Sequence, residues 1–412
     1  MVSCMVLWAF LVTATGYADN PLSPGIPLIV NGGYIVTGNG STIVEYNAEK
    51  SYIPASTLKI ATAFTALELL YPTYHFKTEF YLRGQDLLCI KGYGDPYLIS
   101  EYIREIAGSL KEKGLRRVNG LILDDTFFDV DAPPDGSSNT SNPYDAINSA
   151  LSVNFNSLPL IKYASGAVAS AEPQTPLLPI ARDIAAYLEP GLHRVNVTSF
   201  SRTDDSITHH RYVAELFAEL LRKQGISVAP DYQTGRIRAS DTLFYTYVSG
   251  MTLSEMIRGC LKFSNNFIAN QLFLVSGATR FGPPATWMKS RETIARLLSD
   301  KVGMRPSEFT IVEGSGLSPG NRLTPKAMIQ LLEAFKPYAH LLSRKHAIAL
   351  KSGTLTGVYS YAGYFETSNT LDPFVLFLNQ EQNSRDALLS KLALIYRQAQ
   401  QQPPVPQSTG KP

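Results

Sequence analysis

Apolar positions recur with two different spacings along this chain, and the change between them marks its elements. Alternating runs at 34–36 and 42–46, joined by a turn that contains Gly and Asn, predict a β-hairpin. A helical spacing then runs from Ser56 to Leu70, with an apolar stripe formed by Leu58, Ala61, Phe64, Leu67 and Leu70. Pro72 ends this helix, because proline lacks the amide donor that a helix interior needs.

The middle of the chain has a different pattern. Short apolar runs predict strands at 78–82, 87–90 and 120–123, and a helical pattern covers 101–113. Residues 131–143 are rich in Pro, Gly, Ser and Asn, which predicts an exposed loop. Helical spacing then returns at 211–225, 252–275 and 287–303. The last predicted elements are strands at 347–366 and 373–380 and a closing helix at 384–398.

This order of elements predicts an α/β (α+β) fold in which both ends of the chain close one sandwich. We expect a main domain made of residues 19–74 and 206–398, interrupted by a large, strand-rich inserted domain at 75–205. Residues 399–412 are polar and rich in proline, with too few apolar side chains to join a core. We therefore predict a disordered tail there.

Residues 1–18 have features of a secretory signal peptide. The apolar stretch 5–12 is short, and Gly16 and Ala18 offer small side chains at the −3 and −1 positions. The basic residues that usually precede the apolar stretch of a signal peptide are missing. The alternative interpretation of residues 1–18 is a buried N-terminal strand or helix. We predict cleavage and export to the periplasm, or to another extracytoplasmic, cell-wall-associated place. No other stretch has the roughly 18–20 apolar residues of a membrane span, so no transmembrane anchor is expected after cleavage.

Composition excludes several kinds of protein. The 412 residues carry a net charge of only +2 and no long Lys/Arg run, so nothing favours nucleic acid as a partner. Cys4 would leave with the signal; Cys89 and Cys260 could form one bridge, but two buried free thiols are favoured. Only His209 and His210 are adjacent among six histidines, and no CxxC or HExxH spacing occurs. The sequence therefore predicts no metal site.

Candidate chemistry begins at Ser56-Thr57-Leu58-Lys59. A serine hydroxyl is a weak nucleophile and needs a base within hydrogen-bond reach. Residues at i and i+3 of a helix share a face, so Lys59 can lie beside Ser56. The spacing alone is weak, because Ser408 and Lys411 repeat it in the tail.

Two further motifs follow along the chain. Lys351-Ser352-Gly353-Thr354 lies in a strand-like run, where a glycine lets a substrate backbone approach and the lysine faces its negative end. Ser264-Asn265-Asn266 lies between two helical segments, where a serine hydroxyl can relay a proton. Taken singly, Lys351 could be an edge-strand charge and the Ser264 triplet an ordinary helix cap.

The combination is more informative than any one motif. Ser-x-x-Lys, Ser-x-Asn and Lys-[Thr/Ser]-Gly occur in the order typical of active-site serine penicillin-recognising enzymes. The chain resembles the D-alanyl-D-alanine carboxypeptidase/endopeptidase family, the class C low-molecular-mass penicillin-binding proteins. This resemblance implies a penicillin-binding/β-lactamase-like transpeptidase domain with the insertion described above.

Flanking segments extend the resemblance over residues 30–395. They are Gly94-Asp95-Pro96, Asp124-Asp125-Thr126-Phe127-Phe128, Ser149-Ala150-Leu151, Gly314-Ser315-Gly316-Leu317-Ser318, Asn321-Arg322-Leu323-Thr324-Pro325 and Tyr361-Ala362-Gly363-Tyr364. Two departures from the family occur: Ser352 stands where Thr is commoner, and Glu313 where the family usually has Asp. The hydroxyl survives in the first case; the second leaves fine substrate preference open.

The resemblance implies a role for each motif in acyl transfer. Ser56 would attack the carbonyl of the penultimate D-Ala after Lys59 accepts its proton. Ser264 would relay a proton to the leaving amine, and Asn266 would hold the substrate amide and orient Lys59. The reaction needs no cofactor.

The third motif would hold the substrate. Backbone N–H groups of Ser56 and Thr354 would form the oxyanion hole, and Lys351 with the Ser352 and Thr354 hydroxyls would bind the terminal carboxylate. Gly353 would let the substrate approach. Tyr144 and Asp145, which precede Ser149, are further candidates for reading a free amino group on the peptide, although they could equally be loop residues.

We therefore predict a serine D,D-carboxypeptidase/endopeptidase that cleaves D-Ala-D-Ala ends or D-Ala cross-links of peptidoglycan stem peptides and is acylated by β-lactam antibiotics. One alternative is a β-lactamase or esterase of the same fold, which would need rapid deacylation. A second is a catalytically idle cell-wall binding protein. The intact set of Ser56, Lys59, Ser264, Asn266 and Lys351 argues against idleness.

Overall fold

The computed structural model describes residues 29–401, except 85, 131, 139, 203–207 and 346. The predicted signal peptide and residues 402–412 of the predicted tail lie outside this range. Among the described residues, no helix is long and apolar enough to cross a membrane.

Both ends of the chain build one antiparallel sheet, as the sequence predicts. Its strand order is β15-β16-β17-β18-β1-β2, so the N-terminal hairpin extends the C-terminal strands. The strands are β1 (Gly32–Gly38), β2 (Ser41–Tyr46), β15 (Ser343–Lys345), β16 (Ile348–Leu355), β17 (Val358–Glu366) and β18 (Leu371–Leu378). Their side chains alternate between two hydrophobic clusters, one on each face of the sheet.

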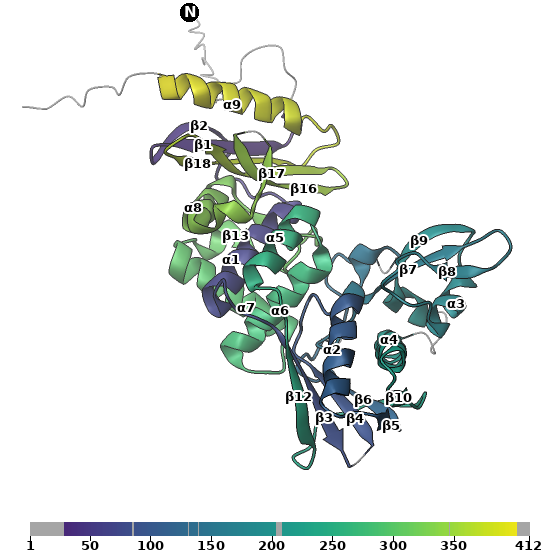
Figure 1. The fold of residues 1–412 in the computed structure, drawn as a ribbon. Coiled ribbons are helices and arrows are strands. Elements are labelled where there is room, and N and C mark those ends of the chain that lie inside the picture. The colour runs from purple at the N-terminus through teal and green to yellow at the C-terminus, as the bar shows by residue number, and fades with distance from the viewer. Residues whose placement is uncertain are drawn as a thin grey trace, which may run out of the picture.

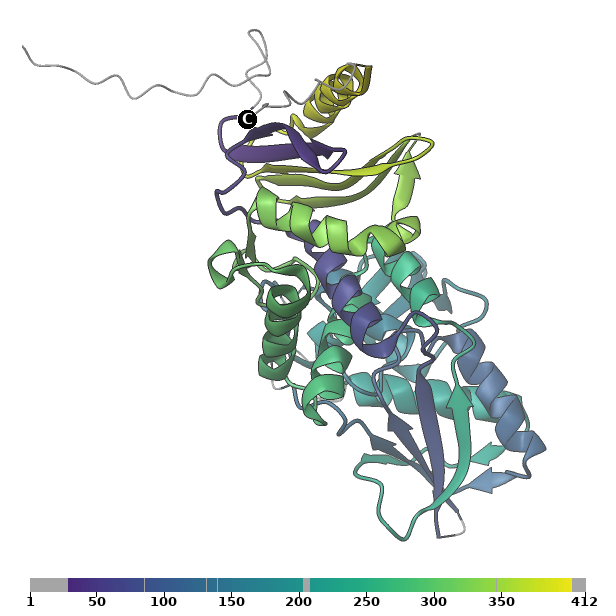
Figure 2. The same ribbon diagram turned by 90° about the vertical axis from the view of Figure 1, so that its left-hand side faces the viewer.

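Helices cover both faces of this sheet. Helix α9 (Arg385–Gln401) lies on one face, and a helical body lies on the other (Figures 1 and 2). The body contains α1 (Lys59–Leu70), α5 (Leu253–Phe263), α6 (Asn266–Phe281), α7 (Trp287–Leu297) and α8 (Pro325–Phe335). Helix α1 is buried along nearly its whole length and packs against α5, α6, α7 and α8.

Short elements connect the larger ones in this body. A 3₁₀ turn, Ala55–Leu58, leads into α1, and a π-helical turn, Leu298–Val302, follows α7 where the sequence predicts helix to 303. The predicted helix 252–275 is broken at Ser264, which has a left-handed backbone with φ of 53°. The remaining pieces are β13 (Phe309–Thr310), β14 (Arg322–Leu323) and the 3₁₀ turns Pro306–Glu308 and Lys336–Leu341.

A second body has its own sheet, with strand order β11-β6-β4-β3-β12. Its strands are β3 (Lys77–Arg83), β4 (Leu87–Gly92), β6 (Gly120–Asp124), β11 (Tyr232–Thr234) and β12 (Thr242–Val248). Helices α2 (Ser100–Glu112) and α4 (His209–Lys223) pack in the same hydrophobic cluster as this sheet. A two-stranded pair, β5 (Arg117–Val118) with β10 (Ser227–Val228), lies at its margin.

A smaller three-stranded sheet completes the second body. Its order is β8-β7-β9, and it packs with α3. These elements are β7 (Ser157–Lys162), β8 (Val168–Ser170), β9 (Gly191–Asn196) and α3 (Pro179–Ala185), with 3₁₀ turns at Pro143–Asp145, Asn154–Asn156 and Val197–Arg202. Figure 1 shows this sheet beside α4 and away from the helical body.

The packing puts the end of the insertion later than the sequence analysis did. Helix α4 and strands β10–β12 belong to the second body, whereas the prediction returned to the main domain at residue 206. Lys77 of β3 pairs with Val248 of β12, so the chain leaves and re-enters the main body on neighbouring strands. We therefore propose an insertion of residues 77–248. The sequence could not show which core α4 joins, because an apolar stripe of this kind would suit packing against either hydrophobic core.

Leu216→Ala should lower the free energy of unfolding by about 2–5 kcal/mol, because Leu216 of α4 is fully buried in the second cluster. The matched control is Lys223→Ala, at the exposed C-terminal end of the same helix. Urea unfolding followed by circular dichroism measures both. Equal stability of the two variants would contradict the assignment of α4 to this core.

Candidate active site

Ser56 lies in the 3₁₀ turn before α1, between two glycines of other segments. Ala55 has φ of 48°, which turns the chain sharply into the helix. A Cβ at Gly316 would lie 2.0 Å from the Ala55 carbonyl oxygen, and one at Gly353 would lie 2.8 Å from the Ser56 nitrogen. Only glycine permits these approaches, so the Gly316 loop and β16 both lie against the backbone of the serine.

Lys59, the first residue of α1, makes three hydrogen bonds. Its Nζ donates to Ser56 Oγ at 3.0 Å, to Asn266 Oδ1 at 2.7 Å and to the Ser315 carbonyl at 2.6 Å. The side chain is buried, and burial lowers the Lys59 pKa to about 8. The amine thus holds a proton weakly while it touches the hydroxyl that it could deprotonate.

Ser264 and Asn266 are presented by a break between two helices. Ser264 closes α5 in a left-handed conformation, and the Asn265 side chain caps α6 by accepting from the Ile268 N–H. Asn266 is therefore the first residue of α6, with its side-chain oxygen at Lys59. The cap that the sequence analysis offered as an alternative is present at Asn265, and it serves to place the two residues beside it.

Lys351 lies on β16 and completes the group. Its Nζ donates to Ser264 Oγ at 2.9 Å and to the Ser352 carbonyl at 2.7 Å. Burial and, to a smaller extent, the nearby charge of Lys59 lower the Lys351 pKa to about 7. The structure therefore brings the five predicted catalytic residues together in two neighbouring hydrogen-bonded groups, Lys59 with Ser56 and Asn266, and Lys351 with Ser264. Of the predicted substrate-binding residues, Ser352 is half-buried, Gly353 is buried and Thr354 is exposed.

A buried carboxylate shapes the loop beside Lys59. Glu313 accepts hydrogen bonds from the N–H groups of Ser315, Gly316 and Ser318, and from the side chains of Ser315, Asn270 and Asn321. These hydrogen bonds fix the position of the Ser315 carbonyl, which accepts a hydrogen bond from Lys59 Nζ. The sequence analysis noted Glu313 as a departure from the family but did not predict that it organises this loop. Its position directly before Gly314-Ser315-Gly316 could have indicated that role.

Sequence reasoning missed Arg385, the first residue of α9. Its Nη1 donates to the Gly353 carbonyl at 2.8 Å and to Thr354 Oγ1 at 2.9 Å. The guanidinium also lies over the Tyr361 ring, 4.5 Å from its centroid. A cation in the first turn of a helix is unfavourable because it opposes the helix dipole. That position was the sequence feature that could have indicated a role for Arg385 outside α9.

The candidates Tyr144 and Asp145 lie in a 3₁₀ turn of the second body. Asp145 is buried and accepts from the Ser138 and Thr140 N–H groups and the Thr140 hydroxyl. The Tyr144 hydroxyl accepts from Asn142 Nδ2. These bonds use the Asp145 carboxylate to hold its own loop, so this geometry does not favour the predicted contact with a substrate amine. Cys89 and Cys260 are free and buried, as predicted.

A chain with this arrangement of Ser56, Lys59, Ser264, Asn266 and Lys351 can be compared with known proteins. The family described as "D-Ala-D-Ala carboxypeptidase 3 (S13) family" matches residues 30–184 and 194–349. The chain belongs to this family. It is 28% identical over 383 residues to a D-alanyl-D-alanine carboxypeptidase of Actinomadura sp. strain R39, covering 81% of this chain and 70% of the relative. Identity to D-alanyl-D-alanine carboxypeptidase DacB of Haemophilus influenzae is 24%, over 87% of both chains.

Solved structures show the same fold. Penicillin-binding protein 4 (DacB) of H. influenzae superposes with a TM-score of 0.72 at 20% identity, over 90% of this chain and 96% of that one. A predatory endopeptidase of Bdellovibrio bacteriovorus in complex with an immunity protein gives a TM-score of 0.52 at 15% identity, over 90% and 93% of the two chains. The predictions of family, fold class and enzyme class are confirmed: the S13 chain is a serine-type D-Ala-D-Ala carboxypeptidase.

Gly316→Ala should slow acylation by fluorescent penicillin by at least about tenfold, since an added Cβ would collide with the Ala55 carbonyl and displace Ser56. The matched control is Gly108→Ala on α2, where an added Cβ has no neighbour within 4 Å. Labelling rates on a gel compare the variants. A wild-type rate in Gly316→Ala would show that this contact does not position Ser56.

Proposed function

We propose that this S13 enzyme cleaves D-Ala-D-Ala ends of peptidoglycan stem peptides, and D-Ala cross-links between them, through an acyl-enzyme on Ser56. The observation that carries the proposal is the contact of Lys59 Nζ with Ser56 Oγ at 3.0 Å, made by a buried amine of lowered pKa. Buried amines of this kind are suited to act as general bases near neutral pH.

Acylation begins with transfer of the Ser56 hydroxyl proton to neutral Lys59. The oxygen forms a bond with the carbonyl carbon of the penultimate D-Ala, and the carbonyl oxygen gains negative charge. Backbone N–H groups of Ser56 and Thr354 stabilise that charge; one such donor contributes roughly 3–4 kcal/mol. The approach of Gly353 to the Ser56 nitrogen supports this pairing of β16 with the serine.

Collapse of the intermediate breaks the peptide bond. The proton that Lys59 accepted from Ser56 passes through the Ser264 hydroxyl to the leaving amine, so that Ser264 gives one proton and receives another, while Lys351, hydrogen-bonded to Ser264 Oγ, supplies positive charge. Lys351, Ser352 and Thr354 bind the terminal carboxylate, and Asn266 holds the substrate amide and keeps Lys59 in place. Arg385 adds a second cation beside Thr354 and is a positioning residue for that strand.

The rate of deacylation separates a carboxypeptidase of this kind from a β-lactamase. A β-lactamase needs a base that activates water against the acyl-enzyme. Glu313 is the acidic residue of the loop beside Ser56, but its oxygens are enclosed by the N–H and side-chain donors described above. Carboxylate oxygens that already accept these hydrogen bonds are not directed at a water beside Ser56. This favours a long-lived penicilloyl adduct over rapid turnover of the antibiotic.

The partners and location follow from the same proposal. β-Lactams mimic the acyl donor, and H. influenzae penicillin-binding protein 4 has been solved with a β-lactam. Peptidoglycan as substrate requires export, so we propose that residues 1–18 are a cleaved signal peptide and that the enzyme acts in the periplasm or another extracytoplasmic compartment.

Ser56→Ala should abolish the fluorescent penicillin adduct and the release of D-Ala from a pentapeptide ending in D-Ala-D-Ala, because no other hydroxyl contacts Lys59 Nζ among the described residues. Ser137→Ala, in the loop of the second body, is the control serine. The wild-type protein should still carry the fluorescent penicillin adduct at the end of a time course followed on a gel. Rapid loss of the adduct would favour a β-lactamase, and labelling of Ser56→Ala would exclude Ser56 as nucleophile.

Acylation should have a narrow, bell-shaped dependence on pH centred between about 7 and 8. The rate rises as Lys59, with its pKa lowered to about 8, loses its proton, and falls as Lys351, with its pKa lowered to about 7, loses the charge that binds carboxylate. Lys351→Arg keeps a cation at all these pH values, so it should remove the alkaline limb. The kcat/KM for a peptide substrate measures both, and an unchanged alkaline limb would contradict the role of Lys351.

A further inference from the structure

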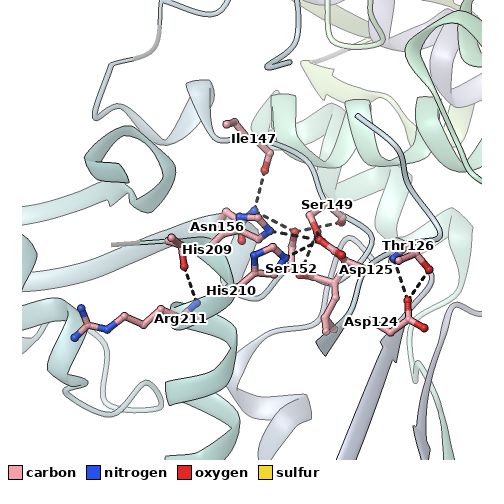
Figure 3. A network of polar contacts seen from close by, with 12 residues as sticks. Asp124, Asp125, Thr126, Ile147, Ser149, Ser152, Asn156, His209, His210 and Arg211 are labelled. Atoms are coloured by element: carbon pink, nitrogen blue, oxygen red, sulfur yellow. Dashed lines mark hydrogen bonds and ion pairs between the residues drawn. The ribbon is translucent and has the colours of Figure 1, made fainter. Parts of the chain in front are cut away.

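A second cluster of ionisable side chains lies in the inserted body, outside the acyl-transfer site. Asp125 follows β6, and His209 and His210 begin α4. One ligand atom from each of the three residues lies within 4.8 Å of the others. Figure 3 shows the two imidazole rings and the Asp125 carboxylate together, with Ser149 and Ser152 beside them. The acyl-transfer mechanism uses none of these residues.

The distances suit a small metal ion. His210 Nε2 lies 2.7 Å from Asp125 Oδ2, and His209 Nε2 lies 3.7 Å from the same oxygen. Ligands of a tetrahedral ion with bonds near 2.0–2.1 Å are about 3.3 Å apart, between these two values. Small side-chain movements would therefore bring the three atoms to ligand positions.

His209 gives independent support. Its Nε2 is out of contact with solvent and has no hydrogen-bond partner among the described residues. Its distance of 3.7 Å from Asp125 is too long for a hydrogen bond. A buried nitrogen of this kind needs a partner.

The surroundings also resemble those of metal ligands. Ser149 Oγ donates to Asp125 Oδ2 at 3.2 Å and so orients the carboxylate. The side chains of His209, His210 and Asp125 are 21%, 24% and 28% exposed, so the cluster is partly open to solvent. The positive end of the α4 dipole opposes a cation here, but the Asp125 charge offsets it.

We propose that Asp125, His209 and His210 bind one divalent transition-metal ion of the zinc class. Two imidazoles and one carboxylate favour such an ion over Mg²⁺ or Ca²⁺, which prefer all-oxygen sites. On binding, both imidazoles donate Nε2 lone pairs and carry their proton on Nδ1, and the carboxylate donates an oxygen. Water occupies the remaining position.

The site joins segments that are distant in sequence. The ion would link the end of β6 to the start of α4, and Asp125 contacts Ser149. The Ser149 carbonyl accepts from Gln271 Nε2 of α6 at 3.0 Å. The expected effect of the ion is thus greater stability of the inserted body and of its contact with the helix that carries Asn266. The sequence predicted no metal site, because adjacent histidines have no ligand spacing and Asp125 is distant along the chain.

The test uses purified full-length protein, stripped with a chelator and then titrated with zinc chloride or cobalt chloride. The wild type should bind about one equivalent of zinc per chain, show cobalt d–d absorption bands, and melt at higher temperature as zinc is added. His209→Gln and His210→Gln should each weaken binding at least about tenfold and remove the zinc-dependent shift in melting temperature. His340→Gln, an exposed histidine elsewhere, is the matched control and should bind as the wild type does.

Penicillin labelling of Ser56 reports whether each variant is folded. Absence of stoichiometric binding by the wild type would overturn the proposal. So would binding that persists in both His→Gln variants, or that is lost in His340→Gln, since either result would mean adventitious surface binding. If a His→Gln variant fails to label, Ser149→Ala replaces it; that variant keeps all three ligands and should weaken zinc binding about tenfold.

Discussion

Burial of two lysine amines in one small volume is the constraint on which this active site depends. An ammonium removed from water is stable only with oxygen acceptors around it, and its pKa falls when burial dominates. Lys59 finds its acceptors on the 3₁₀ turn, on α6 and on the Glu313 loop, and Lys351 finds one at the end of α5. With the Ser352 carbonyl of β16, the acceptors come from five segments, so the amines are satisfied only when the main body is assembled.

The same requirement explains the polar scaffolding around the lysines. The Ser315 carbonyl can face Lys59 only because Glu313 holds the N–H groups of that loop. Thr62 of α1 donates to the Gly314 carbonyl at 2.6 Å and ties the loop to the helix. Glycine at 316 and 353 allows the loop and β16 to reach the serine turn. Glu313 therefore closes the loop, because hydrogen-bond donors of the loop surround both of its oxygens.

Sequence reasoning succeeded where function fixes local spacing. The i, i+3 pair of Ser56 and Lys59 and the order of three motifs led to the site, and periodicity gave most helices and strands. It failed where tertiary packing alone determines a residue's neighbours. The apolar stripe of α4 fits either core, and the role of Arg385 depends on its contact with β16, which is distant in sequence. Asp145 is an error of the opposite kind. The sequence suggested a contact with substrate, but the carboxylate accepts hydrogen bonds from its own loop.

Helix α6 joins the two bodies of the molecule in a single element. Its first residue, Asn266, accepts from Lys59, while Asn148 of the insertion donates to the Phe267 carbonyl at 2.9 Å and to Gln271 Oε1 at 2.9 Å. These bonds are buried, so breaking them leaves unpaired polar groups. The insertion is therefore more than an addition to the main body. Asn148 of the insertion bonds to the start of the same helix whose first residue accepts from Lys59, so both bodies contact one element within two turns.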